Sequence, residues 1–123
     1  MMDVIKSEEE LSVPLVWRRK ISLIVNAIVN GNIGLHALGP EVKSLSEAEV
    51  SQIRSNIVSY GDVLVSLSEI VWDTSVYQWM GSWWEVLVDL STSKEACSDL
   101  VMFVTVRECE HGYCFVVDSI HVP

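Results

Sequence analysis

Four residues near the C-terminus, Cys109, His111, Cys114 and His121, are of types that could bind a metal. Thiolates and imidazoles are the usual zinc ligands, but a structural zinc site combines two well-spaced ligand pairs, which this spacing does not provide. The sequence also contains no GxxxxGK[ST] phosphate loop, no GxSxG nucleophile motif and no HExxH metal motif. We therefore expect no metal, no cofactor and no catalytic residues.

Tryptophans and carboxylates give the second half of the chain a different chemistry, that of binding. Residues 1–60 hold six Lys/Arg against seven Asp/Glu, whereas residues 61–123 hold two against ten. Four of the five tryptophans lie close together in the sequence: Trp72, Trp79, Trp83 and Trp84. Rigid aromatic groups in an anionic field suit docking onto a basic protein, because indole gives contact area at little entropic cost and charge steers the encounter.

The net charge of −9 argues against direct binding of nucleic acid or anionic membranes, since both need a basic face. The acidic first ten residues do not resemble a signal peptide, and the most apolar stretch, residues 21–38, is interrupted by asparagines and glycines. Three cysteines, an odd number, agree with a reducing compartment. We expect one cytoplasmic domain covering residues 1–123; the sequence leaves its oligomeric state open.

Two segments have helical periodicity. Ser12, followed by Val13 and Pro14, predicts a helix start, and the helix should run over about residues 13–30. Ser46 and Glu49 have the spacing of a capping box, and Gly61 suits a left-handed cap, so a second helix is expected over about 47–60.

Four segments beyond Val71 are rich in β-branched and aromatic residues and predict strands at about 73–79, 83–90, 99–108 and 113–122. A short extra strand at 63–67 is an open alternative. Gly81-Ser82 and His111-Gly112 suit two-residue hairpin turns. The first turn pairs Trp79 with Trp84 and Tyr77 with Val86; the second pairs Cys109 with Cys114, Val106 with Val117 and Thr105 with Asp118. The expected fold is α+β, with two N-terminal helices packed on one face of a four-stranded antiparallel β-meander.

Alternation along these strands separates two faces of the sheet. The face toward the helices should carry Tyr77, Trp79, Trp84, Val86, Val88, Leu90, Leu100, Met102, Val104, Val106, Phe115 and Val117. The other face should carry Thr74, Gln78, Trp83, Glu85, Asp89, Thr105, Arg107 and Asp118, with Val76, Leu87, Phe103 and Ile120 between them. On this second face we expect a partner-binding surface, centred on Trp83, Glu85, Asp89 and Asp118 and extended by Glu108, Glu110 and Asp73. A merely solvated sheet face is the alternative.

The cysteines at 109 and 114 are expected to lie opposite each other as packed thiols, with a disulfide as the alternative. Cys97 lies in a polar segment and is expected to be the more reactive thiol if it is exposed.

Residues 83–90 (Trp-Trp-Glu-Val-Leu-Val-Asp-Leu), 98–100 (Ser-Asp-Leu) and the tail 112–122 together resemble small bacterial immunity proteins. The resemblance covers about the last forty residues. It implies a cytoplasmic protein that neutralises a cognate toxin, such as the toxin domain of a contact-dependent growth inhibition system, by binding it. Such toxins are often basic nucleases, which an acidic inhibitor would match.

Two other functions stay open. One is a small enzyme whose pocket lies between residues 32–44 and the sheet edge, which a ligand-sized cavity holding His36 would favour. The other is an interaction module that uses the same sheet face for a different partner or for self-association.

Overall fold

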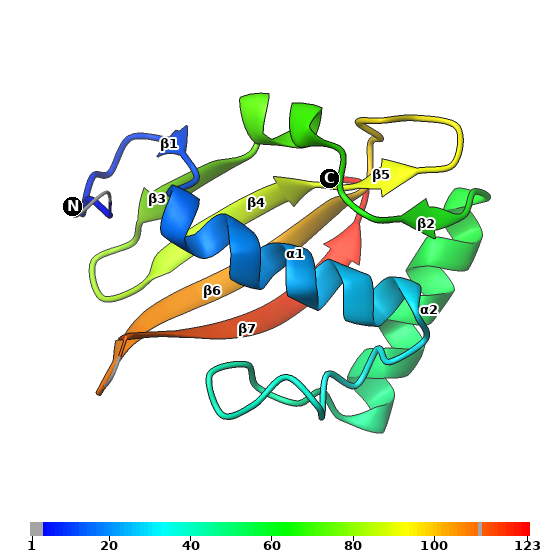
Figure 1. The fold of residues 1–123 in the computed structure, drawn as a ribbon, viewed down its shortest axis with the longest axis horizontal. Coiled ribbons are helices and arrows are strands. Elements are labelled where there is room, and N and C mark those ends of the chain that lie inside the picture. Colours follow the sequence, from blue (N-terminus) through cyan, green and yellow to red (C-terminus); the bar gives the residue numbers. More distant parts are fainter. Residues whose placement is uncertain (1–3, 111) are drawn as a thin grey trace.

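Apolar residues alternate with polar ones in the second half of the chain, and these segments form an antiparallel sheet with one buried face (Figure 1). The computed structural model describes residues 4–110 and 112–123. Its helices are α1 (Leu15–Val29), α2 (Glu47–Tyr60) and the 3-10 helix η1 (Glu69–Asp73). Its strands are β1 (Leu11–Ser12), β2 (Leu64–Val65), β3 (Val76–Trp79), β4 (Trp84–Asp89), β5 (Ser91–Thr92), β6 (Val101–Cys109) and β7 (Gly112–His121). The α+β class is confirmed.

The main sheet has the order β1-β3-β4-β6-β7, so the four predicted strands form the expected meander and β1 adds a fifth at the edge. The prediction of four strands was wrong because it missed β1. A strand of two residues is too short to show an alternation of apolar and polar residues. The first predicted strand begins at Val76 and not at 73, because residues 69–73 form η1. The possible strand at 63–67 exists as β2, which pairs with β5 in a separate two-stranded sheet.

Helix α1 crosses the buried face of the main sheet (Figure 1) and buries Trp17, Ile21, Ile24, Val25 and Ile28. The ring of Trp17 makes edge contacts with four aromatic rings of the sheet at centroid distances of 5.2 to 6.3 Å; they belong to Tyr77, Trp84, Tyr113 and Phe115. The expected Ser12 cap is wrong: Pro14 holds the N-cap position without a side-chain bond, and Ser12 pairs with Val76 in β1.

Helix α2 has the predicted bounds and the predicted capping box. The Ser46 hydroxyl accepts from the Glu49 amide at 3.2 Å, and the Glu49 carboxylate accepts from the Ser46 amide at 2.8 Å. Gly61 ends the helix with a φ of 87°. The helix runs beside strand β7, where the Asn56 amide donates to the Ile120 carbonyl at 2.9 Å, and only Ile53 is fully buried. The prediction that both helices pack on one face is therefore only partly matched, because α1 covers the face and α2 lies against the edge strand.

The β3–β4 hairpin has the predicted register, with Trp79 opposite Trp84 and Tyr77 opposite Val86. The β6–β7 register is wrong by two residues: Cys109 pairs with Gly112, Arg107 with Cys114, and Val106 with Phe115. The predicted turn includes His111, which lies outside the described residues. A shift by two residues leaves the side chains of β6, and those of β7 as far as Val117, on their predicted faces, so this error does not change that part of the core.

A β-bulge changes the second half of β7. Phe103 pairs with Ser119 and Val104 with Val117, which leaves Asp118 as the extra residue, and Thr105 pairs with Val116. The bulge reverses the alternation, and Ile120, predicted on the outer face, is fully buried. Of the residues predicted to face inward, only Trp79 is not fully buried, because it lies near the sheet edge beside the first hairpin.

Cys109 and Cys114 form a disulfide with their Cα atoms 5.9 Å apart, so the expectation of two packed thiols was wrong. They are diagonal neighbours on one face of the hairpin, not an opposed pair. Cys97 is free and exposed. No helix within the described ranges has both the length and the apolar character needed to cross a bilayer.

Candidate partner-binding face

The face of the main sheet turned away from α1 is covered by neither helix, and we call it the open face. Figure 1 shows α1 on one side of the sheet and α2 at its end. By register and alternation the open face carries Val76, Gln78, Glu85, Leu87, Asp89, Val101, Phe103, Thr105, Arg107, Val116, Ser119 and His121, together with Asp118 at the bulge.

An apolar row crosses the open face perpendicular to the strands. Val76 on β3 pairs with Leu87 on β4, and Leu87 pairs with Phe103 on β6. All three side chains are half-buried, so a partner could remove further apolar surface from water. The Phe103 ring stacks on His121 with centroids 4.5 Å apart and an interplanar angle of 4°. Sequence reasoning missed this pair, because the bulge at Asp118 decides which face His121 occupies.

Carboxylates flank this row on both sides. Glu85 and Asp89 precede and follow Leu87 by two positions on β4, so all three side chains share the open face. Asp118 accepts a hydrogen bond from the Thr105 hydroxyl at 2.6 Å, and Thr105 lies opposite Glu85 in the ladder. Thr105 therefore lies between two carboxylates, that of Glu85 on β4 and that of Asp118 on β7.

Asp89 is held by residues just before β3. Its carboxylate accepts from the Thr74 hydroxyl, and its backbone amide donates to the Ser75 hydroxyl at 3.0 Å. The third carboxylate of the face is thereby fixed at the end of the strand. Arg107, which is exposed, is the only lysine or arginine among the open-face positions given above.

Trp83 lies in the β3–β4 hairpin, where its carbonyl accepts from the Met80 amide at 2.7 Å. It is half-buried, and the burial alternates from Trp83 to Val86, with Trp84 and Val86 in the core. The alternation places Trp83 on the same side as Glu85 and at one end of the open face. Neither α1 nor α2 covers this end of the open face (Figure 1).

Three of the predicted binding residues lie elsewhere. Glu108 pairs with Tyr113 on the helix side of the sheet, and its carboxylate forms an ion pair with Lys6 at 3.2 Å. Burial, and to a lesser degree the charge of Glu108, raises the pKa of Tyr113. Asp73 ends η1 and Glu110 lies at the β6–β7 turn, both exposed. The structure thus places Trp83, Glu85, Asp89 and Asp118 on one face of the sheet, spread along β4 and its neighbours, and leaves the other three outside that group.

A depression of about 400 Å³ contains His36. It lies between the segment after α1 and helix α2, not at the sheet edge where an enzyme pocket was expected, and is lined by Gly31, Asn32, Ile33, Gly34, His36, Leu45, Glu47, Val50 and Arg54. This lining offers a base but no serine, threonine or cysteine as nucleophile. Within residues 4–110 and 112–123, no three His, Cys, Asp or Glu residues are placed to hold a metal ion.

The fold and the open face define an α+β domain built around a one-sided antiparallel sheet. Residues 25–123 match the family described as a domain of unknown function, DUF7668, and the chain belongs to this family. The match starts within α1 and includes α2 and all of the main sheet except β1. No curated protein and no solved structure matches the chain.

Proposed function

We propose that this protein is an immunity protein, which binds a cognate basic bacterial toxin domain and neutralises it by covering its active site with the open face. The observation that carries the proposal is the apolar row of Val76, Leu87 and Phe103, flanked by carboxylates on a sheet face that neither helix covers. An amphipathic face of this kind is typical of protein interfaces.

The open face offers two kinds of contact. Leu87 and Phe103 would be removed from water at the centre of the open face and Trp83 at one end of it, and such large buried side chains supply most of the binding free energy of an interface. Glu85, Asp89 and Asp118 would pair with lysines and arginines of the partner. Charge pairs of this kind raise the association rate by roughly 10- to 1000-fold at low salt.

A nuclease toxin suits this chemistry best. Its active site must hold cations that bind phosphate groups, and carboxylates on a rigid sheet can occupy the same cations. The inhibitor would then block substrate entry by occlusion, with no chemical step of its own. The site of action we propose is the cytoplasm, where such a toxin meets nucleic acid.

The decisive experiment is co-expression with candidate basic toxin domains from the same genome, those encoded beside this gene first, scored as rescue of growth. Wild-type protein should restore growth and form a stoichiometric complex. The double reversal Glu85→Lys with Asp118→Lys should weaken the complex at least tenfold, because two charge pairs become repulsive. A matched control, Glu47→Lys with Glu69→Lys, changes the net charge equally at two exposed residues outside the open face and should keep the affinity.

Two results would refute different parts of the proposal. Absence of rescue with a folded protein would exclude the immunity role. Rescue and unchanged affinity in the Glu85→Lys, Asp118→Lys variant would keep the immunity role but exclude the open face as its binding surface.

A further inference from the structure

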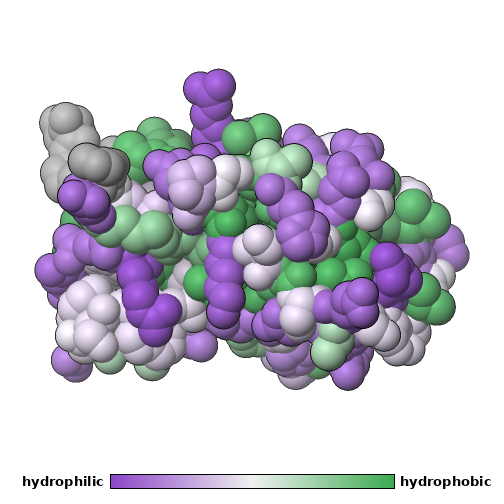
Figure 2. Space-filling model, turned by 90° about the horizontal axis from the view of Figure 1, so that it is seen from below, coloured by the Kyte–Doolittle hydropathy of each residue, from purple (hydrophilic) through white to green (hydrophobic). Residues whose placement is uncertain are grey.

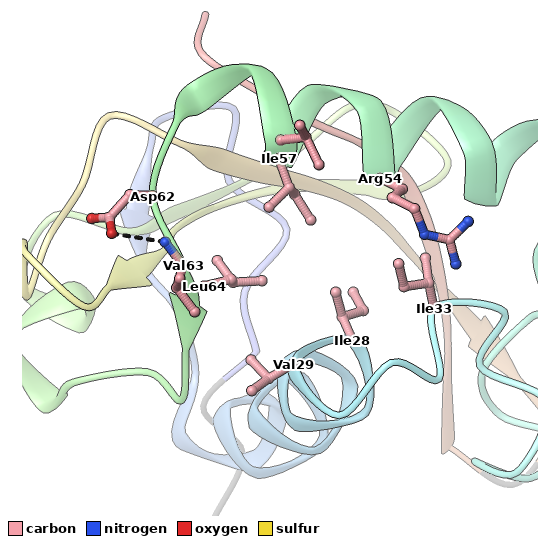
Figure 3. A pocket seen from close by; sticks show the side chains of 9 residues that line it. Ile28, Val29, Ile33, Arg54, Ile57, Asp62, Val63 and Leu64 are labelled. Carbon is pink, nitrogen blue, oxygen red and sulfur yellow. Dashed lines mark hydrogen bonds between the residues drawn. The ribbon is translucent and has the colours of Figure 1, made fainter.

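A second apolar surface lies on the helix side of the molecule, in a groove between α1, α2 and β2 (Figure 3). The groove has a volume of about 210 Å³. Its walls are aliphatic, with no aromatic side chain, and consist of Ile28, Val29, Ile33, Ile57, Val58, Val63 and Leu64, with Arg54 and Asp62 as the only polar members.

The groove exists because the chain separates its two helices. Helix α1 ends at Val29, and the chain passes through Ile33 before α2 begins; Gly61 then ends α2 and directs the chain into β2. Part of the resulting apolar lining is open to water: Val58 is 72% exposed and Val63 is 66% exposed. Apolar groups exposed around a concavity indicate a ligand site. Figure 2, which views the molecule from below, shows hydrophobic residues reaching the surface between hydrophilic ones.

The two charged residues of the groove differ in their partners. Asp62 accepts from the Ser93 hydroxyl at 2.6 Å, the Val63 amide at 2.7 Å and the Lys94 amide at 3.2 Å. These bonds, that from Ser93 first, hold the pKa of the Asp62 carboxyl far below its usual range. Its oxygens are therefore already hydrogen-bonded within the protein, and it keeps its negative charge.

Arg54 has no such hydrogen-bond partners within the described part of the chain. Within the described part of the chain its guanidinium group takes part in no ion pair and no hydrogen bond. Figure 3 shows its side chain beside Ile33, at the end of the groove remote from Asp62. An exposed guanidinium without a protein partner, next to an aliphatic wall, suits an anion that carries an apolar chain, because this cation can bind a carboxylate through two parallel hydrogen bonds.

Arg54 and Ile33 also line the polar depression that contains His36, so the two concavities adjoin at these residues. Two residues after Ile33 the backbone is strained: Leu35 is buried with a φ of 62°, a conformation that non-glycine residues rarely adopt. The polar side of the boundary gives a bound headgroup access to water, while the aliphatic side shields a chain.

We propose that this groove binds an aliphatic monocarboxylate, with the chain between α1 and α2 and the carboxylate on Arg54. A cavity of about 150 Å³ accommodates benzene, so the present groove suits a chain of about six to eight carbons. The aliphatic walls, which include no aromatic ring, fit a flexible chain better than a flat ring. The site is independent of the proposed immunity function, since it lies on the helix side of the sheet.

The test is a titration of the isolated protein with sodium octanoate, followed by methyl NMR signals. Octanoate should shift the methyl signals of Ile28, Ile33 and Leu64 saturably, whereas octylamine should not bind and octan-1-ol should bind at least tenfold more weakly. Arg54→Gln should weaken octanoate binding about tenfold or more, since the charged hydrogen bonds to the carboxylate are lost. Arg19→Gln, an exposed arginine on α1 outside the groove, is the matched control.

Arg54 is exposed on α2, so Arg54→Gln should fold, and an unchanged circular dichroism spectrum checks this. Absence of saturable shifts would overturn the proposal, as would equal binding of octylamine or full affinity in Arg54→Gln. Methyl shifts that follow protein concentration without octanoate would also overturn it, because they would identify a second copy of the chain as the occupant.

Discussion

Trp17 connects the helix to the sheet at the level of a single side chain. It is 1% exposed, and its ring contacts rings from β3, β4 and β7. Among the described residues its Nε1 is the one buried side-chain nitrogen or oxygen without a hydrogen-bond partner. The packing of α1 is thus stabilised by ring contacts and burial, at the cost of an unpaired donor.

Trp17→Phe should therefore destabilise the fold much less than Trp17→Ala. The alanine variant loses all four ring contacts and leaves a cavity, for an expected loss of about 3–5 kcal/mol in the free energy of unfolding. The phenylalanine variant keeps an aromatic ring and removes the unpaired donor, and its loss should stay below about 2 kcal/mol. Urea denaturation of both variants measures the difference, and equal losses would contradict this account.

At the residue scale, period-two alternation correctly predicted which side chains of the sheet face the core, up to Val117 on β7. Trp84, Val86, Val88, Met102 and Val104 are all fully buried as predicted. Ile120 was assigned to the wrong face because a β-bulge adds one residue, and no residue type in the sequence marks Asp118 as the bulge. A single unpaired residue thus limits how far alternation can be extended along a strand.

At the scale of elements, helix α2 was predicted with its bounds because its signals are local. A capping box and a terminal glycine each act within a few residues, so the sequence contains all the information needed. Strand β1 and the placement of α2 beside β7 depend on contacts between distant residues. Sequence patterning gives the face that an element buries but not the neighbour that covers it.

The capping box makes part of the stability of α2 dependent on pH. Hydrogen bonds from the Ser46 amide, and then from its hydroxyl, lower the pKa of Glu49. A lowered folded-state pKa means that this contribution is present above the unfolded-state pKa of about 4.3 and is lost as the pH falls through the folded-state pKa. Glu49→Gln should therefore be less stable than wild type at pH 7, and the difference should shrink at lower pH.

Ser46→Ala should cost about 1 kcal/mol at pH 7, the usual loss for an N-cap serine. Ser55→Ala, in the exposed middle of α2, is the matched control and should be neutral or slightly stabilising. Denaturation curves at neutral pH and at about pH 3 test both statements. A Glu49→Gln deficit that stays constant with pH would show that the carboxylate charge does not stabilise the cap.

At the scale of the whole molecule, the acidic excess of residues 61–123 is spread over both sides of the sheet. Glu85, Asp89 and Asp118 share the open face, whereas Glu108 is paired with Lys6 on the helix side. Period-two spacing predicted the first group, whereas no such spacing supported the extension to Glu108, Glu110 and Asp73, and these three lie elsewhere. The Arg54 groove was not predicted at all, because its walls come from three separated segments.

A partner that meets the open face should associate at a rate that depends strongly on salt. Raising the ionic strength from about 0.01 M to about 1 M shortens the Debye length from about 30 Å to about 3 Å, and the wild-type association rate should fall at least tenfold. Glu85→Lys with Asp118→Lys should flatten this dependence, whereas Glu47→Lys with Glu69→Lys should change it less. Stopped-flow mixing with the cognate toxin domain gives the rates. If both double variants lowered the slope equally, net charge alone would steer the encounter, and the local arrangement of carboxylates around Leu87 would have no part in it.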